Sequence, residues 1–388
     1  MTENPYRQKF LELNETLVAA GHSALERKPG VSYKALINQA ETLLADLGAP
    51  TPEAELTEAA PQQAVIHAAF DPGNRSILFY DGKTKIELAS TYSQLIGDRS
   101  PQRMDDQSAL ISIHSSQGSP EFNDWRYVIG TAAQHQRKFE RVYNCPKFGE
   151  SLLYLLPCVV KAFGDRDEIT LKLDVNATEA DVNESVLQRK LLGTTVFNSQ
   201  GRDFKLNVKQ VSAFEEGLGA FYRHQESQPT QPGKFYGVLN LGGATLDALL
   251  CDHQGYVYID NSFRSPKGGT FDLCIELKNT IAASYEEARH IPIDFFMDAV
   301  KSGDYTINGE YDFTEVVHPI IHNWFRDLLG NVKAQWENYF HKIDRYILTG
   351  GSAYLVKDKI ASLSRFHLAF DPIFDNVVGI YQRENLNG

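Results

Sequence analysis

Short apolar runs that end in glycine-containing turns form the clearest pattern in the chain. Residues 64–70 have the composition of a buried strand, residues 71–76 that of a turn, and residues 77–80 that of the returning strand. An Asp-Gly pair at residues 81–82 predicts a second hairpin turn, which leads into residues 83–89. This part of the chain therefore predicts three consecutive strands joined by two turns.

The same arrangement returns near the middle of the chain. Residues 234–240 predict an apolar strand, and a second apolar strand follows Gly242 and Gly243. Adjacent glycines carry no Cβ, so the N–H groups of such a turn can approach a ligand and form an anion-binding concavity. An ordinary tight hairpin would also explain the glycines. The run of small residues that ends in Thr245 favours a phosphate ligand.

A third glycine turn lies closer to the C-terminus. Residues 345–348 predict a strand that enters a helix through Thr349, Gly350, Gly351 and Ser352. The first turn of a helix has N–H groups without helical partners, which suit an anion or the polar edge of a ligand. Three such turns in one chain form a stronger pattern than one alone.

Helices alternate with strands between these turns, which is typical of an α/β chain. Predicted helices cover residues 148–163, with an irregularity at Pro157, residues 179–191 and residues 271–283; predicted strands cover residues 169–174, 196–197, 204–211 and 255–260. Residues 225–233 are polar and rich in proline, and they predict a loop between two lobes.

Before residue 64 the pattern is helical. Apolar residues recur at four-three spacing along two seams, which consist of Tyr6, Phe10, Leu13, Leu17 and Ala20, and of Tyr33, Ile37, Ala40, Leu44 and Leu47. Residues 49–61 are rich in Pro, Ala and Glu and predict a linker. Two short helices bury too little surface to be stable alone. We therefore expect them to pack on their own body, on a neighbouring subunit or on a separate partner.

Composition narrows the class of protein. The 388 residues, 42% hydrophobic and 23% charged, can bury a full core and predict two domains or more. The net charge of −12 opposes direct binding to nucleic acid or to an anionic membrane. The sequence has neither a membrane-spanning apolar stretch nor the pattern of a signal peptide. Four cysteines without CxxC spacing predict free thiols in a cytoplasmic protein.

The order of the glycine turns resembles the actin-like ATPase superfamily, which includes actin, DnaK-type chaperones and sugar kinases. Residues 71–76 are similar to its first phosphate motif, residues 240–245 to its second, and residues 349–353 to its adenosine motif. Within the superfamily the chain most resembles the ParM-like actins of bacterial and archaeal plasmid segregation. Segments 125–133, 213–220, 241–247 and 370–381 carry that resemblance.

The resemblance implies a two-lobed α/β fold, the ribonuclease H-like fold of actin, with a nucleotide in the cleft between the lobes. We expect an N-terminal helical hairpin and linker over residues 1–62. The first lobe is expected over residues 63–228, completed by residues 371–388, and the second lobe over residues 229–370.

The resemblance also implies roles for individual residues. Glu216 is the expected catalytic residue, which positions or activates water at the terminal phosphate. Acids are favoured at helix N-termini, which would explain both Glu215 and Glu216, and we expect only a capping role for Glu215. Residues expected at the phosphates are Asp71, Gly73, Asn74, Arg75, Asn240, Gly242, Gly243, Ala244 and Thr245. Residues expected at the adenosine and ribose are Gly268, Gly269, Gly350, Gly351 and Ser352. Asp71 is also expected to hold Mg²⁺ through water.

Two positions depart from the pattern of the family. Asn240 stands where most relatives have an acid that helps to hold magnesium through water. Leu78 stands where actin and ParM-like proteins often have a lysine that faces the phosphate. Loss of one outer-shell group typically costs about 10–100-fold in metal affinity or activity. We therefore expect slow hydrolysis, or nucleotide binding with little hydrolysis.

The implied function is filament formation that depends on ATP or GTP and Mg²⁺, in plasmid segregation or intracellular organisation. An adaptor protein, rather than direct contact with nucleic acid or membrane, is the expected partner besides the filament itself. A nucleotide-binding regulator or scaffold that does not polymerise is the alternative that Asn240 favours. A small-molecule kinase of the same superfamily is a second alternative, but it needs a substrate base near the cleft, and the sequence assigns none.

Overall fold

A computed structural model divides the chain into two compact units, Met1–Gln62 and Gln63–Gly388. In the second unit it describes residues 64–97, 101, 104–136, 138–141, 148–266, 268–307 and 309–386. In the first unit it describes residues 13–15, 17–18, 25, 36, 40, 42 and 43.

The described residues of the first unit bury apolar side chains against one another. Leu13, Leu17, Leu36 and Ala40 form one buried cluster. Leu13 and Leu17 belong to the first predicted seam and Ala40 to the second. The rest of both seams, the predicted hairpin as a whole and the linker at residues 49–61 lie outside the described residues.

The second unit contains a large mixed sheet, in which the described residues form ten strands in the order β3-β2-β1-β8-β10-β9-β5-β6-β4-β7. The strands are β1 (Ile66–Pro72), β2 (Ser76–Tyr80), β3 (Lys85–Ala89), β4 (Thr91–Leu95), β5 (Ser108–Ser116), β6 (Trp125–Gly130), β7 (Glu140–Arg141), β8 (Glu168–Ala177), β9 (Gly193–Ser199) and β10 (Arg202–Glu215). The strands predicted before residue 90 and at residues 169–174, 196–197 and 204–211 are therefore confirmed, with β8, β9 and β10 longer than predicted.

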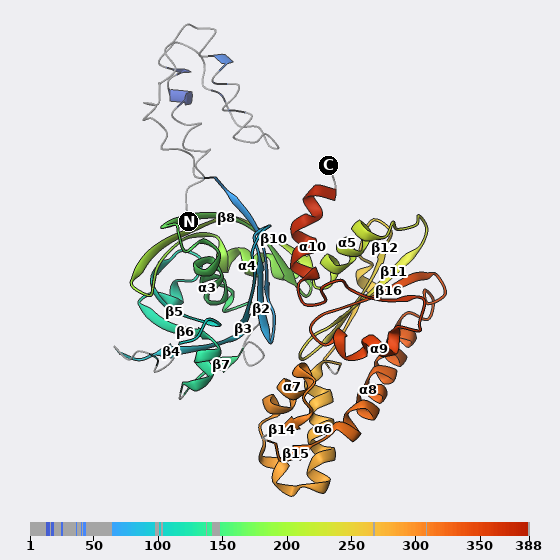
Figure 1. The fold of residues 1–388 in the computed structure, drawn as a ribbon. Coiled ribbons are helices and arrows are strands. Elements are labelled where there is room, and N and C mark those ends of the chain that lie inside the picture. The colour runs from blue at the N-terminus through green and yellow to red at the C-terminus, as the bar shows by residue number, and fades with distance from the viewer. Residues whose placement is uncertain are drawn as a thin grey trace. The chain divides into compact units, whose positions relative to one another are not determined.

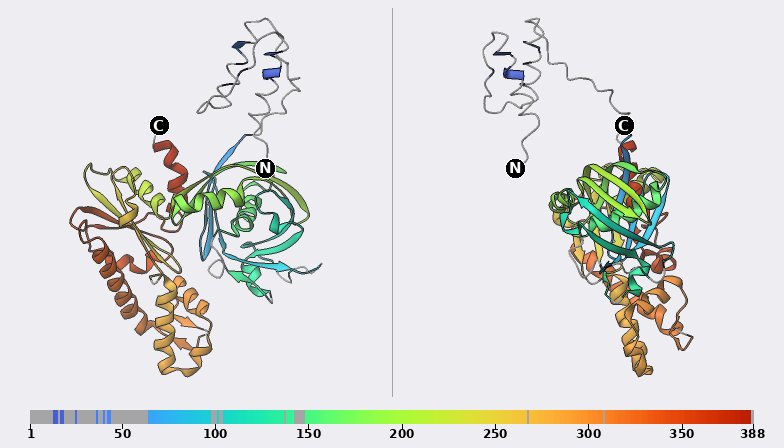
Figure 2. Two further views of the ribbon diagram at one scale, coloured as in Figure 1. Left: turned by 180° about the vertical axis from the view of Figure 1, so that it is seen from behind. Right: turned by 90° about the vertical axis from the view of Figure 1, so that its left-hand side faces the viewer.

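This first sheet curls around α3 (Ser151–Phe163), as Figure 1 and Figure 2 show. All side chains from Ser151 to Val159 are buried. A helix that is apolar on all sides is expected inside a core. The helix continues through Pro157, so the predicted irregularity does not interrupt it. The predicted helix at residues 179–191 is also present, as α4 (Ala180–Leu191).

A second sheet repeats the topology of five neighbouring strands at one end of the first sheet. Its strands in the described chain follow the order β13-β12-β11-β16-β17 and are β11 (Phe235–Leu241), β12 (Leu246–Asp252), β13 (Phe263–Ser265), β16 (Ile343–Thr349) and β17 (Phe366–Leu368). In each set of five strands, taken in chain order, the first strand pairs antiparallel with the second and parallel with the fourth. The second strand also pairs antiparallel with the third, and the fourth pairs parallel with the fifth. Strands β3-β2-β1-β8-β10 correspond in this way to β13-β12-β11-β16-β17.

The helices that follow the fifth strand of each sheet cross each other and pack on the opposite sheet. Helix α5 (Leu218–Ser227) follows β10 and shares a core with β11, β12 and β16 of the second sheet. Helix α10 (Asp375–Leu386) follows the second sheet and packs on β1 and β2 of the first. The helices touch at Gly219 and Gly379, where a Cβ on either residue would lie 1.9 Å from a backbone oxygen of the other helix. The predicted boundary at residues 228–229 falls after α5 and stays a prediction.

In the described residues, four α-helices and a short hairpin accompany the second sheet. They are α6 (Thr270–Ser284), α7 (Ile293–Ser302), α8 (Thr314–Gln335), α9 (Lys357–Ile360) and the pair β14 (Thr306–Ile307) and β15 (Tyr311–Asp312). After β16 the chain enters a 3₁₀ helix, η6 (Ala353–Val356), before α9, so the helix expected after the third glycine turn begins with a 3₁₀ segment. We call the first sheet with α3 and α4 the first lobe, and the second sheet with α6–α9 the second lobe.

One predicted strand is wrong. Residues 255–260 contain no strand: Gly255 lies in a turn, Val257 makes an isolated bridge to Cys251, and a 3₁₀ turn covers Ile259–Asn261. Tyr256 is 68% exposed, so this apolar-looking segment has no continuous buried face to hold it in a sheet.

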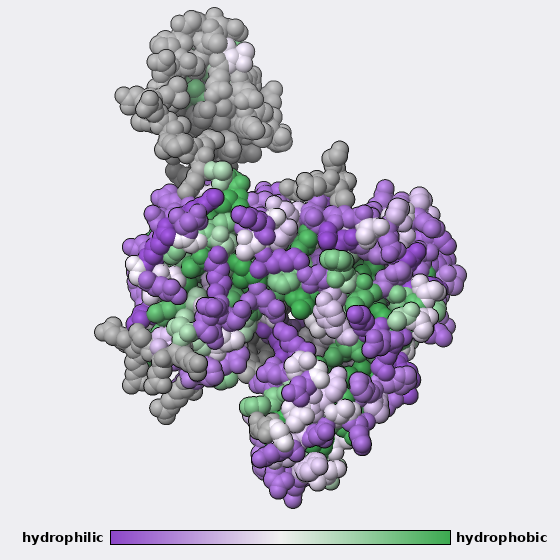
Figure 3. All heavy atoms as spheres, in the orientation of Figure 1, coloured by the Kyte–Doolittle hydropathy of each residue, from purple (hydrophilic) through white to green (hydrophobic). Residues whose placement is uncertain are grey.

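Hydrophilic side chains cover much of the face seen in Figure 3, and none of the helices in the described parts of the chain could cross a membrane.

Candidate functional site

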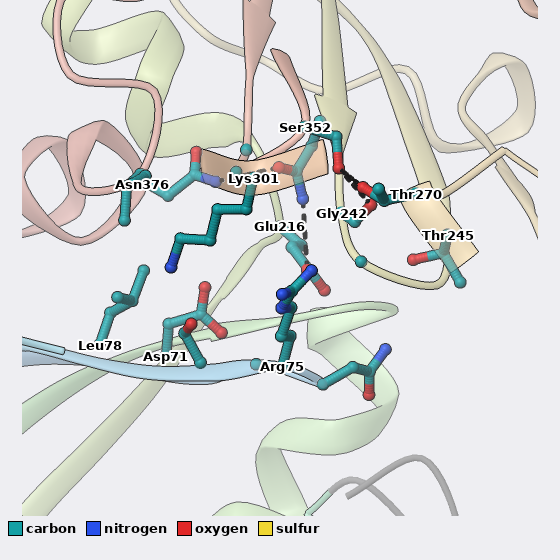
Figure 4. A pocket seen from close by; sticks show the side chains of 18 of the residues that line it. Asp71, Arg75, Leu78, Glu216, Gly242, Thr245, Thr270, Lys301, Ser352 and Asn376 are labelled. Carbon is teal, nitrogen blue, oxygen red and sulfur yellow. Dashed lines mark hydrogen bonds between the residues drawn. The ribbon is translucent and has the colours of Figure 1, made fainter. Parts of the chain in front are cut away.

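A pocket lies where the glycine turns of the two sheets face each other. Figure 4 shows Asp71, Leu78 and Arg75 on the side of the first sheet, opposite Gly242 and Ser352. The predicted site residues that line this pocket are Asp71, Gly73, Asn74, Arg75, Glu216, Asn240, Gly242, Gly243, Thr245, Gly350, Gly351 and Ser352. Residues that are far apart in sequence, in three separate turns, therefore meet in one place.

The first turn, between β1 and β2, is tight and is held by hydrogen bonds from Ser90, which lies beyond β3. Gly73 has no room for a side chain, because a Cβ there would lie 2.5 Å from the carbonyl oxygen of Ser76. The N–H of Ser90 donates to the carbonyl oxygen of Arg75 at 3.0 Å, and its hydroxyl donates to the carbonyl oxygen of Gly73. Asp71 lies at the end of β1 and is only 6% exposed.

The second turn, between β11 and β12, is tied to the start of α6. The N–H of Gly242 donates to the carbonyl oxygen of Thr245 at 2.9 Å, which closes the turn. The N–H groups of Thr270 and Phe271 donate to the carbonyl oxygens of Gly242 and Gly243, at 3.3 and 2.8 Å. Because the first N–H groups of a helix lack partners within the helix, the turn and α6 stabilise each other.

Three predicted residues do not line the pocket: Ala244 of the second turn, and Gly268 and Gly269, which pack against that turn. A Cβ on Gly269 would lie 2.4 Å from the carbonyl carbon of Ala244, and a Cβ on Gly268 would lie 2.9 Å from the Cβ of Leu246. The two glycines therefore allow α6 to approach the turn closely. Their expected contact with the adenosine or ribose, and that of Ala244 with phosphate, stay predictions.

The third turn, after β16, is joined to the second by hydroxyl groups. Ser352 Oγ donates to the carbonyl oxygen of Gly242 at 3.0 Å and also contacts the hydroxyl of Thr270. Gly350 has φ +86°, a conformation that favours glycine. A Cβ on Gly351 would meet no atom within 4 Å, so this glycine faces open space at the pocket.

Glu216 follows β10 and enters the pocket from the first lobe. Its two carboxylate oxygens accept hydrogen bonds from different lobes: Oε2 from the Thr178 hydroxyl at 3.1 Å, and Oε1 from Asn240 Nδ2 at 3.2 Å. Asn240 Oδ1 in turn accepts a hydrogen bond from Asn376 Nδ2 at 3.4 Å. The carboxylate is thus held at a defined place beside the first and second glycine turns.

The neighbouring Glu215 has a different role. Its Oε1 accepts a hydrogen bond from the N–H of Ala180, the first residue of α4, at 2.7 Å. Burial raises the pKa of this carboxyl, and the hydrogen bond opposes that rise. Glu215 therefore caps α4, whereas the sequence interpretation assigned it to the helix that follows it.

Two cations line the pocket among the described residues, one from each lobe. Arg75 Nη2 lies 2.8 Å from Asp298 Oδ1 of α7, and Lys301 Nζ of α7 lies 3.4 Å from Glu87 Oε1 of β3. The turns themselves approach closely here, because a Cβ on Gly243 would lie 3.2 Å from the Cβ of Arg75. These two ion pairs thus link α7 to the first glycine turn and to β3.

Sequence reasoning missed several residues that line the pocket. They are Ser76, Glu87, Thr270, Val300, Lys301, Leu355, Ile373 and Asn376. Thr270 directly follows the predicted glycine pair, and Asn376 lies in a segment that carries the family resemblance. Lys301 belongs to an ordinary amphipathic helix and has no local signal. Leu78 lines the pocket as a buried apolar side chain, 7% exposed.

The residues present fit a nucleoside polyphosphate with Mg²⁺. The close backbone turns at Gly73 and Gly243 leave no side chain between a phosphate and the main chain, and Arg75 and Lys301 supply positive charge. Among the residues that the structure describes, no three His, Cys, Asp or Glu side chains form a group that could hold a metal ion directly. Mg²⁺ keeps several waters and needs only one or two carboxylates, so Asp71 alone could hold it through water.

Comparison with known proteins identifies the fold. Residues 238–362 match a family model described as the C-terminal part of the MreB-like archaeal actin homologue. No curated protein sequence matches the chain. The chain is similar in structure to Ta0583, an archaeal actin homolog, in complex with ADP: the TM-score is 0.66 and the identity 15%, over 84% of this chain and 100% of that one.

Two ParM structures give the same result. A 15-stranded ParM filament from Clostridium botulinum has a TM-score of 0.66 and 13% identity, over 84% of this chain and 100% of that one. ParM from Bacillus thuringiensis with AMPPNP has a TM-score of 0.60 and 13% identity, over 84% and 99%. At these identities the similarity establishes the fold. The chain therefore has the mixed α/β, two-lobed actin-like fold.

Proposed function

We propose that this chain binds ATP or GTP with Mg²⁺ in the pocket and hydrolyses it slowly. The observation that carries the proposal is the meeting of two glycine turns, from equivalent hairpins of two sheets, beside the carboxylates of Asp71 and Glu216. A structural hairpin needs no partner turn, whereas a polyphosphate is bound by backbone and cationic groups from both sides.

The proposed hydrolysis is a single displacement. The oxygen of a water molecule bonds to the terminal phosphorus while the bond from that phosphorus to the bridging oxygen breaks. The electron pair of the broken bond leaves with the nucleoside diphosphate. Glu216 orients the water and accepts its proton, and Arg75 and Lys301 offset the charge of the phosphates. Mg²⁺, when bound, would add positive charge at the phosphates, and Asp71 would hold it through water.

Assembly into filaments is the second part of the proposal. The filament known for Clostridium botulinum ParM supports it, as the two chains share their fold. The net charge of −12 opposes direct contact with DNA, so any role in DNA segregation would act through an adaptor protein. In this proposal residues 63–228 with 371–388, and residues 229–370, act as the two nucleotide-clamping domains.

Phosphate release and light scattering, followed together, test both parts. With ATP or GTP and Mg²⁺ we expect slow phosphate release and a rise in scattering above a critical protein concentration, both absent when EDTA is added. Nucleotide binding without a rise in scattering would contradict assembly and favour a regulator or scaffold. Transfer of phosphate to a small molecule, without scattering, would favour a kinase. Absence of nucleotide binding would contradict the whole proposal.

A further inference from the structure

We propose that Asn376 and Asn240 are positioning residues that form a hydrogen-bond relay from the crossing of α5 and α10 to Glu216, and so fix that carboxylate as an acceptor. This inference rests on the proposed function for the role of Glu216, but the relay itself can be tested without turnover. It assigns a purpose to Asn240 that differs from the magnesium role expected of an acid at that position.

The relay consists of three hydrogen bonds that join two buried asparagines to a backbone N–H at one end and to the half-buried Glu216 at the other. The N–H of Ala220, in the first turn of α5, donates to Asn376 Oδ1 at 3.3 Å. Asn376 Nδ2 donates to Asn240 Oδ1 at 3.4 Å, and Asn240 Nδ2 donates to Glu216 Oε1 at 3.2 Å. Both asparagines are only 3% exposed, so water cannot readily replace these bonds.

The direction of the relay is fixed at both ends. A backbone N–H can only donate, so the atom of Asn376 that faces Ala220 must be its oxygen. An ionised carboxylate can only accept, so the atom of Asn240 that faces Glu216 must be its nitrogen. The remaining amide atoms then match, because Asn376 presents Nδ2 and Asn240 presents Oδ1. With an aspartate in place of Asn240, a carboxylate would face the Glu216 carboxylate, and one of the two would need a proton.

The position of Asn376 connects the carboxylate to the region where the lobes meet. Asn376 is the second residue of α10, and a Cβ on Gly219 of α5 would lie 1.9 Å from its carbonyl oxygen. Asn240 stands at the end of β11, in the second lobe. A shift of α10 against α5 would therefore move the donor that orients Asn240, and with it the support of Glu216.

Several charged groups surround the relay. Asp71 and Glu87 line the same pocket as Glu216, as do the cations Arg75 and Lys301, and Glu215 precedes Glu216 in the chain. Asp375 precedes Asn376 and lies 3.6 Å from Arg223. Burial raises the pKa of Asp375. These charged groups stay the same when only an amide of the relay is changed. A shift in the pH dependence of phosphate release that follows such a change therefore reports on the relay.

Asn376→Asp reverses the relay with little change in size. The introduced carboxylate would still accept from Ala220, but its other oxygen would also accept, so the Asn240 amide would turn and present Oδ1 to Glu216. Glu216 would then be stabilised in its protonated form, which cannot accept the proton of water. We expect the low-pH limb of the phosphate-release rate to move to higher pH by about one unit or more. Asn323→Asp, the same chemical change at an exposed position of α8, should leave the profile unchanged.

A double-mutant cycle measured by thermal unfolding tests the relay without any measurement of phosphate release. At pH 8 Asn376→Asp should lower the midpoint of unfolding, because the folded state then prefers a proton that the unfolded state has lost. Glu216→Gln in the Asn376→Asp background should restore at least half of that loss, because the introduced glutamine amide can donate to the turned Asn240. The same substitution in the parent chain should give no such gain.

The outcomes separate the two proposals. Coupling in the unfolding cycle without phosphate release in the parent would support the relay and contradict the proposed turnover. Additive effects in the cycle, or an unchanged pH profile, would overturn the relay. If Asn376→Asp does not fold with or without Glu216→Gln, the same cycle with Asn240→Asp decides, since that change also places an acceptor against Glu216. Absence of coupling there would overturn the relay as well.

Discussion

Asp71 and Asn240 occupy equivalent places in the two sheets. Each lies near the end of the first strand of the repeated topology, two residues before a glycine of the turn. Yet one is an acid and the other an amide. The two lobes therefore present similar backbone turns to the pocket with different side-chain chemistry.

The cross-strand partners of these two residues also differ: the acid of the first sheet faces an apolar residue, whereas the amide of the second sheet faces an acid. Asp71 pairs in register with Leu78, whereas Asn240 pairs with Asp247. Asp247 accepts a hydrogen bond from Thr245 at 3.1 Å and lies 3.5 Å from Arg264. The second lobe thus uses its acid to hold its turn, and its amide to hold Glu216. The comparison indicates that the carboxylates lining the pocket in the described chain come from the first lobe, whereas the second lobe supplies backbone, hydroxyl and amide groups together with the cation Lys301.

The largest expected effect tests whether Glu216, a carboxylate of the first lobe, accepts the proton of the attacking water. Glu216→Gln keeps the size of the side chain and removes the proton acceptor. We expect phosphate release to fall by about 10²-fold or more, the usual contribution of a general base, while nucleotide affinity stays within about twofold. Single-turnover phosphate release together with nucleotide titration checks both. An unchanged rate would remove Glu216 from the mechanism.

A somewhat smaller effect tests whether the two turns form one clamp. Gly243→Val places a branched side chain where a Cβ would already lie 3.2 Å from the Cβ of Arg75. The turns must separate, so we expect nucleotide to bind about 100-fold more weakly, which is about 2.8 kcal/mol. Gly330→Val is the matched control, because a Cβ at Gly330 meets no atom within 4 Å. Equal affinity of Gly243→Val and the parent chain would contradict the clamp.

The parts of the site that could be predicted are those with local chemistry. Gly73, Gly242 and Gly350 stand out because a turn between two apolar runs has few other uses for glycine. Lys301 could not be found in this way, since its place in the pocket depends on how α7 packs against the first lobe. The relay through Asn376 depends on the crossing of two helices that lie far apart in sequence. The strand predicted at residues 255–260 was wrong because an apolar pattern alone does not show which side of a segment is buried.

A still smaller effect sharpens the comparison between Asp71 and Asn240. Asn240→Asp gives the second lobe the same acid as the first. The family resemblance predicts a faster rate and a stronger dependence on magnesium, by about tenfold, as is typical of outer-shell changes. The 3.2 Å contact with Glu216 sets a second carboxylate against the first, so the gain should appear only at high magnesium. Phosphate release titrated with Mg²⁺ checks this. A rate that falls at every magnesium concentration would show that Asn240 serves Glu216 alone.

The smallest expected effect on nucleotide binding comes from deletion of the N-terminal unit. Met1–Gln62 separates from the rest of the chain as a compact unit, and its described residues bury Leu13, Leu17, Leu36 and Ala40 against one another. The lining residues of the pocket that the structure describes belong to the second unit. The linker predicted at residues 49–61 carries Glu53, Glu55 and Glu58, and the entropic cost of closing a flexible linker grows only slowly with its length.

Deletion of residues 1–62 should therefore leave nucleotide affinity within about twofold of the parent, because it removes none of the described lining residues of the pocket. We expect a change in assembly instead, since two apolar seams that are too short to be stable alone must pack on another surface. Sedimentation and light scattering at a series of protein concentrations should show a changed critical concentration or changed bundling, with nucleotide titration as the control. If the truncated chain unfolds or aggregates before nucleotide is added, the seams belong to the core of their own body. Unchanged assembly of a folded truncated chain would instead indicate that the seams pack on a separate partner.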